Sequence, residues 1–275
     1  MANDSSNTPA NSATETPLAG EFALTQRYGN ILVITINRPE SYNALHPPAN
    51  FALADIFDEF AKDDDLWVAI ITGSGDKAFC SGNDLKYQAS GKNMTMPDTG
   101  MGGLTSRFDM HKPIIAAVNG LALGGGFEVA LSCDLIIAAE HARFGLPEAK
   151  VGLFPATGGV QILREQVPRK IANEILLTAK QISAAEALEF RLINKVVAAD
   201  QLMQSAFELA TEICQSSPKA IQATKQLLNE IGEENGDAKK MALSTPAIIA
   251  LTKTEDFREG ITAFVEKRSP NWKNK

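Results

Sequence analysis

Short apolar runs, each bounded by turn-forming or charged residues, recur along the first half of the chain. Four of them have the length of buried strands, at 31–36, 67–72, 114–118 and 135–138. Pro39 follows the first run, where proline cannot extend a ladder of backbone hydrogen bonds. Between the first two runs, a stretch opened by Pro47 and Pro48 carries apolar residues at helical spacing. Strand, helix and strand in this order predict a parallel crossover unit.

The third run leads into the stretch around which the chain is organised. An Asn-Gly turn follows it, and three consecutive glycines at 124–126 then precede a helical segment at 127–133. The N-terminus of a helix favours negative charge, and Glu128 lies in that first turn. Backbone donors beside a carboxylate suit chemistry that builds an oxyanion and moves a proton. The alternative is that the glycines only allow tight packing and that Glu128 only complements the helix dipole.

Further glycine-containing segments are candidates for ligand contacts. Residues 81–86 form a turn into a short helix, and the N–H groups of such a turn offer a second anion-facing nest. Residues 89–106 combine four glycines with three methionines, which indicates either a lid or acyl-pocket wall or an ordinary exposed connection. Glu148 lies directly after Pro147, twenty residues beyond Glu128. A single glutamate in a loop is usually solvated, so only its context makes it a candidate.

Residues 73–78 fit the pattern G-x-G-x-x-A of a dinucleotide-binding loop. The match is weak, because a true fingerprint opens a helix directly, whereas Phe79-Cys80-Ser81-Gly82 follows here. We therefore do not expect a nicotinamide or flavin site.

The second half of the chain is predicted to be helical from Pro168 onward. Helix starts are indicated by Pro168 at a first helical position, a capping box at 183–186, Ser217-Pro218, and a cap within 252–255. The last helix has apolar residues on one face and ends at Lys267 and Arg268, where cations are favoured. This half is expected to be a helical appendage whose apolar faces pack between subunits or within one.

Length, charge and cysteine content restrict the classes of partner and environment that we expect for the protein. A chain of 275 residues suits one large domain or a domain with an appendage. The net charge of −7 argues against nucleic acid or an anionic membrane as the main partner. Three cysteines without paired or metal-like spacing are typical of reduced thiols in a cytoplasmic protein. No apolar run approaches the length of a membrane span.

An ordered series of motifs resembles the crotonase, or enoyl-CoA hydratase/isomerase, superfamily over about residues 21–273. The motifs are NRP at 37–39, NAL at 43–45, AFCSGNDLK at 78–86, AAVNG at 116–120, LGGGFE at 123–128, CD at 133–134, ARFGLPE at 142–148 and EDFREG at 255–260. The resemblance implies an α/β fold, a crotonase-like spiral of ββα units with a C-terminal α-helical trimerisation region. The expected partition is a disordered tail at 1–20, the spiral core at 21–200 and the helical region at 201–275.

The resemblance also implies a substrate class and an assembly. The substrate is expected to be an acyl-CoA thioester, with coenzyme A entering as part of the substrate and with no metal and no other cofactor. A homotrimer or a hexamer built from two trimers is expected, without a nucleic-acid or membrane partner. His46, His111 and His141 have no partners at catalytic spacing and are expected to be structural or surface residues.

Matching the motifs residue by residue assigns the site. The oxyanion hole is expected to use the backbone N–H groups of Asn83 and Gly125, and losing one such donor typically costs roughly 3 kcal/mol. Glu128 and Glu148 match the two glutamates of family hydratases; the usual assignment gives water activation to Glu128 and protonation of Cα to Glu148. The implied substrate and CoA contacts are Glu40, Ser41, Tyr42, Ala44, Ser81, Asp84, Leu85, Lys86, Gly124 and Pro147, with Phe264 and Lys267 reaching the CoA of a neighbouring subunit. The alternative for Lys267 is a helix-end charge only.

Two glutamates favour reversible addition of water across the 2,3 double bond of a 2-enoyl-CoA. The rivals are an enoyl-CoA isomerase, which needs one base, a carnitinyl-CoA-type dehydratase, and a non-catalytic acyl-CoA- or RNA-binding relative. Departures from the commoner hydratase pattern are Asn83 for a small residue, Leu146 for glutamine, and PATGGV at 155–160 for PGxGGT. Together with PEAKVG at 147–152 they resemble carnitinyl-CoA dehydratase relatives. These departures leave the identity of the substrate's acyl group undetermined.

Overall fold

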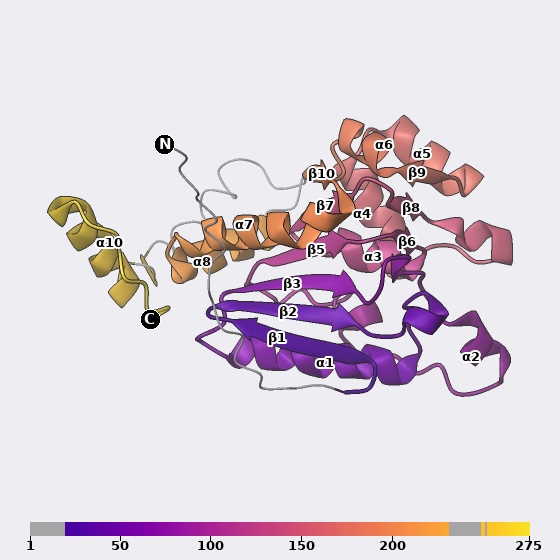
Figure 1. The fold of residues 1–275 in the computed structure, drawn as a ribbon, viewed down its shortest axis with the longest axis horizontal. Coiled ribbons are helices and arrows are strands. Elements are labelled where there is room, and N and C mark those ends of the chain that lie inside the picture. Colours follow the sequence, from indigo (N-terminus) through magenta and orange to yellow (C-terminus); the bar gives the residue numbers. More distant parts are fainter. Residues whose placement is uncertain (1–19, 231–248, 251) are drawn as a thin grey trace, which may run out of the picture.

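A six-stranded sheet forms the centre of the computed structural model, which describes residues 20–230, 249–250 and 252–275 apart from the side chains of Phe264 and Val265 (Figure 1). In spatial order its strands are β1 (Ala23–Tyr28), β2 (Ile31–Ile36), β3 (Val68–Gly73), β5 (Ile114–Val118), β7 (Leu135–Ala139) and β10 (Lys195–Val197). β1 pairs antiparallel with β2, and the other neighbouring pairs are parallel. The four strands predicted from apolar runs all lie in this sheet. The predicted tail at 1–20 lies outside the described residues, except for Gly20.

A second, four-stranded sheet lies beside it. Its order is β4 (Ala78–Cys80), β6 (Leu121–Leu123), β8 (Arg143–Gly145) and β9 (Gln181–Ser183), with β4, β6 and β8 parallel and β9 antiparallel to β8. The chain places a strand in the large sheet and the next one in the small sheet, as β3 then β4, β5 then β6, and β7 then β8. This alternation confirms the predicted α/β spiral of ββα units.

The helices and 3-10 turns connect these strands. The helices are α1 (Pro47–Lys62), α2 (Leu85–Ala89), α3 (Gly125–Leu131), α4 (Gly159–Gln166), α5 (Arg169–Thr178), α6 (Ala184–Glu189), α7 (Leu202–Cys214), α8 (Pro218–Glu230) and α10 (Glu255–Glu266). The 3-10 turns are η1 (Pro39–Ser41), η2 (Met101–Gly103), η3 (Pro147–Val151) and η4 (Ala199–Gln201). Within this described part of the chain, none of the helices combines the length and apolar character needed to cross a membrane.

Alternate residues of the large sheet enter two hydrophobic cores. On β3, Ile71 belongs to the larger core, together with Phe57 of α1. Its neighbour Ile70 belongs to the second core, together with Leu202 and Ala206 of α7. Because both faces of the sheet are covered there, β2, β3, β5 and β7 are apolar at nearly every position, and this is why they were predictable as continuous runs.

The prediction of a purely helical second half was wrong at two places. β9 and β10 both lie beyond Pro168, and each has only three residues. Such short strands carry too few positions to show a period of two, and tertiary pairing decides them. Pro168 itself is the N-cap of α5 with an extended ψ of 137°, one residue before the first helical position.

The predicted caps in this half are confirmed. Ser183 and Glu186 form a reciprocal capping box at the start of α6. The Ser217 hydroxyl accepts the Ala220 N–H at 3.3 Å, and the Thr254 hydroxyl accepts the Phe257 N–H at 3.1 Å. Each hydroxyl satisfies a backbone donor that has no partner within its own helix.

The segment 89–106 divides into two parts. Its second part is packed: Met101 is buried, and the Gly102 N–H donates to Asn50 Oδ1 of α1 at 2.7 Å. The expectation of a lid or an exposed connection therefore does not hold for residues 100–105, which are buried, while the expectation of an acyl-pocket wall stays a prediction. Met94 and Met96, in the first part, are half-buried.

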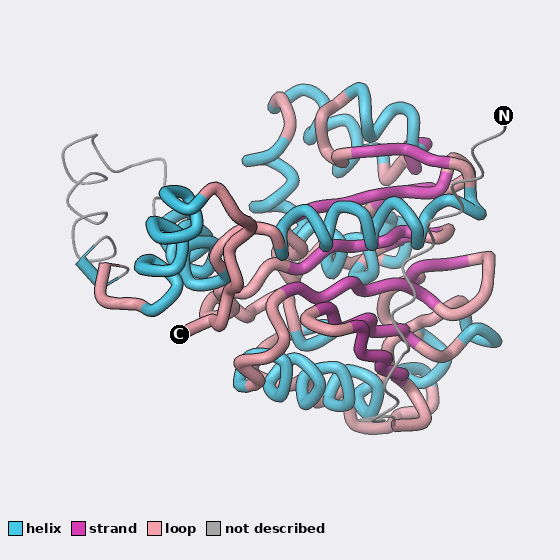
Figure 2. Tube along the Cα trace, turned by 60° about the vertical axis from the view of Figure 1, so that its left-hand side comes forward, coloured by secondary structure: helices cyan, strands magenta, loops and turns pink. Residues whose placement is uncertain are grey.

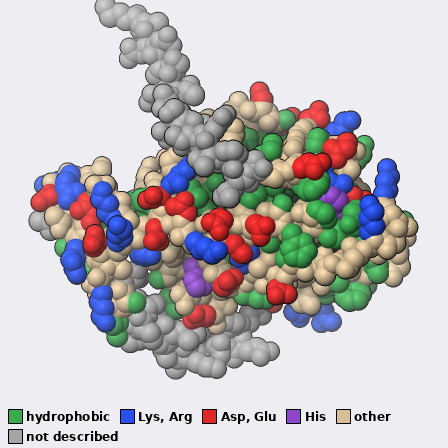
Figure 3. Space-filling model, turned by 90° about the horizontal axis from the view of Figure 1, so that it is seen from below, with side chains coloured by type: hydrophobic (Ala, Val, Ile, Leu, Met, Phe, Trp, Pro, Cys, Tyr) green, Lys and Arg blue, Asp and Glu red, His purple; other side chains and the backbone are tan. Residues whose placement is uncertain are grey.

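The C-terminal helices lie at one end of the molecule. Figure 1 shows α10 and the C-terminus far from β6 and β8, and Figure 2 shows the same separation of these helices from the sheets. The C-terminal segment ties them to the body, because Asn274 Nδ2 donates to the Asp64 carbonyl at 2.7 Å and Trp272 Nε1 donates to the Gln215 carbonyl at 2.8 Å. On the face drawn in Figure 3, acidic and basic side chains are interspersed.

Candidate active site

Three segments that follow neighbouring strands of the small sheet meet at one edge. β4 leads into residues 81–84, β6 leads into Gly124 and α3, and β8 leads into η3, which carries Glu148. Since β4, β6 and β8 are adjacent and parallel, their carboxyl ends lie at the same edge. Ligands commonly bind beyond the carboxyl ends of parallel strands. The topology thus gathers residues that are far apart in the sequence.

The turns that carry Asn83 and Gly125 pack directly on each other. A Cβ atom placed on Gly82, which has a φ of +92°, would lie 3.0 Å from the Gly125 nitrogen. Leu45 holds the first turn in a parallel bridge: its N–H donates to the Gly82 carbonyl at 2.7 Å, and its carbonyl accepts the Asp84 N–H at 2.9 Å. Within the described residues, neither the Asn83 N–H nor the Gly125 N–H donates to a protein acceptor. Two neighbouring backbone donors are therefore available to a ligand.

Glu128 has a carboxylate surrounded by donors, and its side chain is 2% exposed. The N–H groups of Thr157 and Gly159 each donate to Oε1 at 2.8 Å, and the Thr157 hydroxyl donates to Oε2 at 2.5 Å. Gly159 is the first residue of α4, so the positive end of that helix faces the carboxylate. The charge of Glu128 is thus matched by a second helix, and not only by the dipole of its own helix α3.

Glu148 has the opposite surroundings. Its Oε2 atom is buried and has no hydrogen-bond partner among the described residues. Burial raises the pKa of Glu148, and the charge of Glu128 raises it further, while a backbone interaction opposes the shift. The residue is half-buried, so it is not the solvated loop glutamate that its position alone would suggest.

Gly124 brings the second glutamate against the helix start. It is the N-cap of α3 with a φ of +54°, a backbone conformation that favours glycine. A Cβ atom at this position would lie 3.2 Å from Glu148 Oε1. The absent side chain therefore leaves room for the carboxyl group of Glu148 beside the free N–H of Gly125.

The ion pair between Arg38 and Asp84 anchors the loop that carries Asn83. Arg38 Nη1 donates to Asp84 Oδ2 at 2.9 Å and also to the Ala44 carbonyl, and both acidic and basic side chains are largely buried. Asp84 Oδ1 accepts the Tyr87 N–H at 3.0 Å and so caps α2. Burial alone would raise the pKa of Asp84, but the Tyr87 N–H and the Arg38 guanidinium outweigh it and lower the pKa.

The predicted CoA contacts fall into several places. Glu40 and Ser41 lie in η1, and Tyr42, which is 47% exposed, lies beside Ser81, whose N–H donates to the Tyr42 carbonyl at 3.1 Å. The other predicted contacts are Leu85 and Lys86, exposed on α2; Ala44 and Asp84, which are buried around Arg38; Pro147, at the start of η3; and Lys267, exposed beyond α10. Phe264 lies in α10, but its side chain is outside the described residues.

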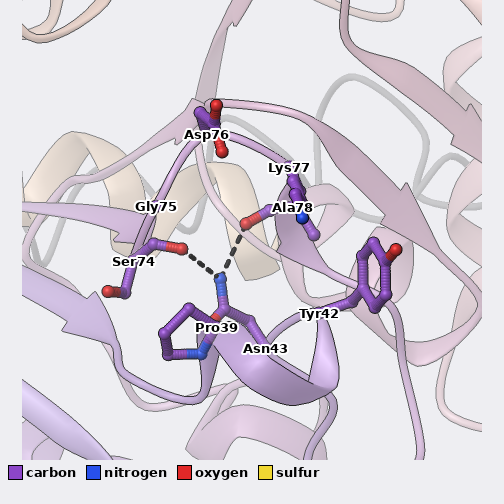
Figure 4. Close-up of a pocket in the computed structure, with 8 residues that line it drawn as sticks. All are labelled: Pro39, Tyr42, Asn43, Ser74, Gly75, Asp76, Lys77 and Ala78. Atoms are coloured by element: carbon purple, nitrogen blue, oxygen red, sulfur yellow. Dashed lines mark hydrogen bonds between the residues drawn. The ribbon is translucent and has the colours of Figure 1, made fainter.

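A pocket of about 230 Å³ lies next to the first of these places (Figure 4). It is lined by Pro39, Tyr42, Asn43, Ser74, Gly75, Asp76, Lys77 and Ala78. Asn43 Nδ2 donates to the Ser74 carbonyl at 3.0 Å and to the Ala78 carbonyl at 2.7 Å, which joins the two walls. Of the residues predicted from the sequence, Tyr42 is the one that lines this pocket, and neither glutamate reaches it.

The structure does not support the weak dinucleotide-binding motif at residues 73–78. Residues 78–80 form β4 and not a helix, so the G-x-G-x-x-A pattern does not present a helix N-terminus to a pyrophosphate. The cysteines offer no reactive thiolate either, because burial raises the pKa of Cys80 to about 12 and that of Cys214 to about 11. His46 has a structural role, since its Nδ1 atom accepts the Ala49 N–H and caps α1.

Sequence reasoning missed two parts of the site. Thr157 and Gly159 were noted only as members of a loop that departs from a family motif at its neighbouring residues, although they supply all three donors to Glu128. Arg38 was part of a motif but was not assigned to the site, although it anchors Asp84. For Thr157 and Gly159, the available signal was the glycine-proline composition of residues 151–159. This composition does not show which residue faces the loop.

Comparisons with known proteins agree with this geometry. The family model for enoyl-CoA hydratase/isomerase matches residues 26–275. Carnitinyl-CoA dehydratase from Salmonella arizonae is 44% identical over 255 residues, covering 90% of this chain and 96% of the relative. The corresponding protein from Proteus mirabilis is 42% identical over 255 residues, with coverage of 90% and 96%.

Solved structures extend the similarity to the fold. A probable enoyl-CoA hydratase/isomerase from Mycobacterium abscessus has a TM-score of 0.87 and 38% identity, covering 94% of this chain and 100% of the other. A carnitinyl-CoA hydratase from Mycobacterium avium has a TM-score of 0.74 and 41% identity, with coverage of 94% and 100%. The two sheets and the glycine turn at the start of α3 occur together with a family match over most of the chain and with similar solved structures. The chain therefore belongs to the enoyl-CoA hydratase/isomerase family of the crotonase superfamily, whose enzymes act on acyl-CoA thioesters.

Proposed function

We propose that the protein catalyses the reversible addition of water across the 2,3 double bond of a 2-enoyl-CoA thioester. One observation carries this proposal: two glutamates with opposite surroundings lie beside two free backbone donors. Glu128 accepts three hydrogen bonds, whereas Glu148 has a buried oxygen without a partner. Water addition needs one carboxylate as a base and one carboxyl group as an acid, and unlike environments separate the two roles.

In the hydration direction, the thioester oxygen would accept the N–H groups of Asn83 and Gly125. Glu128 removes a proton from water while the oxygen of that water forms a bond to Cβ. The electron pair of the double bond moves toward the thioester, and the resulting enolate oxygen is stabilised by the two donors. Protonated Glu148 then delivers its proton to Cα. Proton exchange with solvent returns Glu128 to its ionised form and Glu148 to its protonated form.

The raised pKa of Glu148 supports its part in this scheme. A carboxyl group whose pKa is raised by burial stays protonated to higher pH and so remains able to donate to Cα. Positioned acid–base catalysis is worth roughly 10²–10⁴-fold for each group, and each oxyanion donor roughly 3 kcal/mol. In the reverse direction Glu148 removes the Cα proton, and protonated Glu128 releases water from Cβ.

A second candidate within the same chemistry is the elimination of water from a carnitinyl thioester. Relatives named carnitinyl-CoA dehydratase at 44% identity favour it, as does the segment PEAKVG at 147–152. A carnitinyl group carries a quaternary ammonium that a crotonyl group lacks. Turnover of carnitinyl-CoA compared with 3-hydroxybutyryl-CoA therefore decides between a specialised and a general hydro-lyase.

The proposed function is tested with Glu128→Gln and Glu148→Gln on a 2-enoyl-CoA substrate. Each change removes one proton-transfer group and is expected to lower hydration by roughly 10²–10⁴-fold. Glu165→Gln is the matched control, because Glu165 is an exposed glutamate of α4. A cis-3-enoyl-CoA substrate tests the isomerase, which would tolerate the loss of one glutamate. Near wild-type hydration by either variant would contradict the two-glutamate mechanism.

We also propose that the C-terminal helices assemble three copies of the chain. Leu228 of α8 is 69% exposed, and Phe257 and Ile261 of α10 are 39% and 53% exposed. Burying these side chains between copies would remove apolar surface from water. Light scattering on the purified protein tests for a trimer or a hexamer. In such an assembly, Lys267→Ala is expected to raise KM for the thioester with little change in kcat.

A further inference from the structure

We propose that Thr157 is a positioning residue for the reaction: its hydroxyl determines which lone pair of Glu128 Oε2 takes the proton from water. The proposal rests on the proposed function, because it assumes that Glu128 activates water. Thr157 does not need to touch the substrate in this role. It acts through the carboxylate that it binds with both its backbone N–H and its side chain.

The two oxygens of Glu128 differ in what they can still accept. An ionised carboxylate offers about four lone-pair sites, two on each oxygen. Oε1 accepts the N–H groups of Thr157 and Gly159, both at 2.8 Å, and its two sites are filled. Oε2 accepts the Thr157 hydroxyl at 2.5 Å and no other donor among the described residues. One acceptor site remains on the carboxylate, and it is on Oε2.

The remaining site has a fixed direction. Thr157 binds Oε1 through its N–H and Oε2 through its hydroxyl, so one residue holds both ends of the carboxylate. Rotation of the carboxylate would break both bonds at once. Thr157 is also β-branched, which restricts its own χ1 angle. The free lone pair of Oε2 is therefore held in one orientation, as a base must be to accept the proton of a bound water.

The hydroxyl is a feature of this chain and not a requirement of the fold. The commoner family motif PGxGGT leaves the position of Thr157 open, and here the loop is PATGGV. The two backbone donors do not depend on the side chain at 157. Removing only the hydroxyl should thus leave Glu128 in place with a second free lone pair on Oε2 and with less stabilisation of its charge.

The test compares Thr157→Val, which keeps the shape and loses the donor, with Thr157→Ser, which keeps the donor. Thr178→Val is the matched control, because the Thr178 hydroxyl donates to the Glu174 carbonyl at the exposed end of α5. We expect Thr157→Val to lower kcat for hydration about 10- to 100-fold with little change in KM, since one charge-assisted hydrogen bond is lost. Thr157→Ser should stay within about threefold of wild type.

A second measurement separates positioning from a purely structural role. Exchange of the Cα protons of a saturated acyl-CoA with deuterated water needs Glu148 and the oxyanion donors, but not water activation. Thr157→Val should retain this exchange while hydration falls; a loop that is merely disordered would lose both. If valine prevents folding, Thr157→Ala removes the same hydroxyl from a smaller side chain, and the same loss of hydration with retained exchange is expected.

Three outcomes overturn the proposal. They are wild-type hydration by Thr157→Val, equal loss of hydration and exchange in that variant, and failure of Thr157→Ser to retain activity. The proposed function has its own test, since Glu128→Gln with near wild-type hydration would contradict it directly. Loss of hydration in Glu128→Gln together with wild-type hydration by Thr157→Val would overturn only the role of Thr157.

Discussion

Two regions of the molecule each hold one glutamate, and they differ in the hydrogen bonding and the burial of its carboxyl group. Where α3 meets the start of α4, Glu128 accepts two backbone N–H groups and a hydroxyl. In η3, Glu148 has an oxygen that is buried without a partner, and burial raises its pKa. The first region stabilises a charge by surrounding it with donors, and the second disfavours a charge by removing water.

The difference shows that the surroundings of a carboxyl group, and not its residue type, set its chemical role. Donors favour the charged form, which can accept a proton, while desolvation favours the neutral form, which can donate one. The charge of Glu128 adds to this separation, because it raises the pKa of the neighbouring Glu148. A reaction that both removes and delivers a proton needs such an unlike pair.

The largest expected effect separates the two roles by their reactions. Glu148→Gln should lose both hydration and Cα proton exchange by roughly 10²–10⁴-fold, because Glu148 transfers the Cα proton in both. Glu128→Gln should lose hydration to a similar extent but keep Cα exchange. Product formation followed by absorbance and deuterium incorporation followed by NMR measure the two rates. Loss of exchange in Glu128→Gln, and not in Glu148→Gln, would reverse the assignment.

A smaller effect is expected on stability. Glu128→Gln replaces a charged acceptor that holds three donors, so it should lower the free energy of unfolding by about 1.5–3 kcal/mol. Glu148→Gln removes a buried group that has no partner on Oε2, so it should not destabilise the protein. Urea unfolding of the two variants at pH 7 makes the comparison. Equal destabilisation by both would show that their surroundings do not differ in energy.

The pH dependence of this difference has a definite sign. The pKa of Glu148 is raised from its ordinary value of 4.5, so the folded state binds this proton more tightly than the unfolded state does. The contribution of Glu148 to stability is therefore fully present below about 4.5 and is lost as the pH rises through the folded pKa. Melting temperatures of wild type and Glu148→Gln should converge at acidic pH and separate at neutral pH, with the variant the more stable. Separation at acidic pH would contradict the raised pKa.

The smallest expected effect comes from the glycine beside Glu148. Gly124→Ala places a methyl group 3.2 Å from Glu148 Oε1 at a φ of +54°. Gly91→Ala is the matched control, since Gly91 has a φ of +73° and nothing lies within 4 Å of its added Cβ. Both changes should cost about 1–3 kcal/mol, because each places a Cβ atom on a residue with a positive φ. Only Gly124→Ala should also slow hydration, by up to about tenfold, as Glu148 is displaced. Equal rates in the two variants would show that Glu148 does not need this space.

Much of the fold was predictable because the large sheet is covered on both faces. Strands such as β2 and β5 are apolar at nearly every position, which marks them without any knowledge of their neighbours. β9 and β10 were not predictable, because three residues carry no period and their pairing depends on β8 and β7. Residues 100–105 were expected in a loop and are buried, since the Gly102 N–H finds its partner on α1, about fifty residues away.

The sequence by itself determined four strands of the large sheet, the helix caps, the glycine turn before α3 and the family motifs that single out Glu128 and Glu148. It did not determine how these two residues differ. The donors to Glu128 lie 29 and 31 residues further along the chain, on a loop and a helix start that reach it only when α4 packs against α3. The burial of Glu148 likewise depends on β8 lying beside β6. Hydrogen bonding and desolvation are properties of the space around a group, so only the tertiary structure decided which glutamate is surrounded by donors and which is buried without a partner for one of its oxygens.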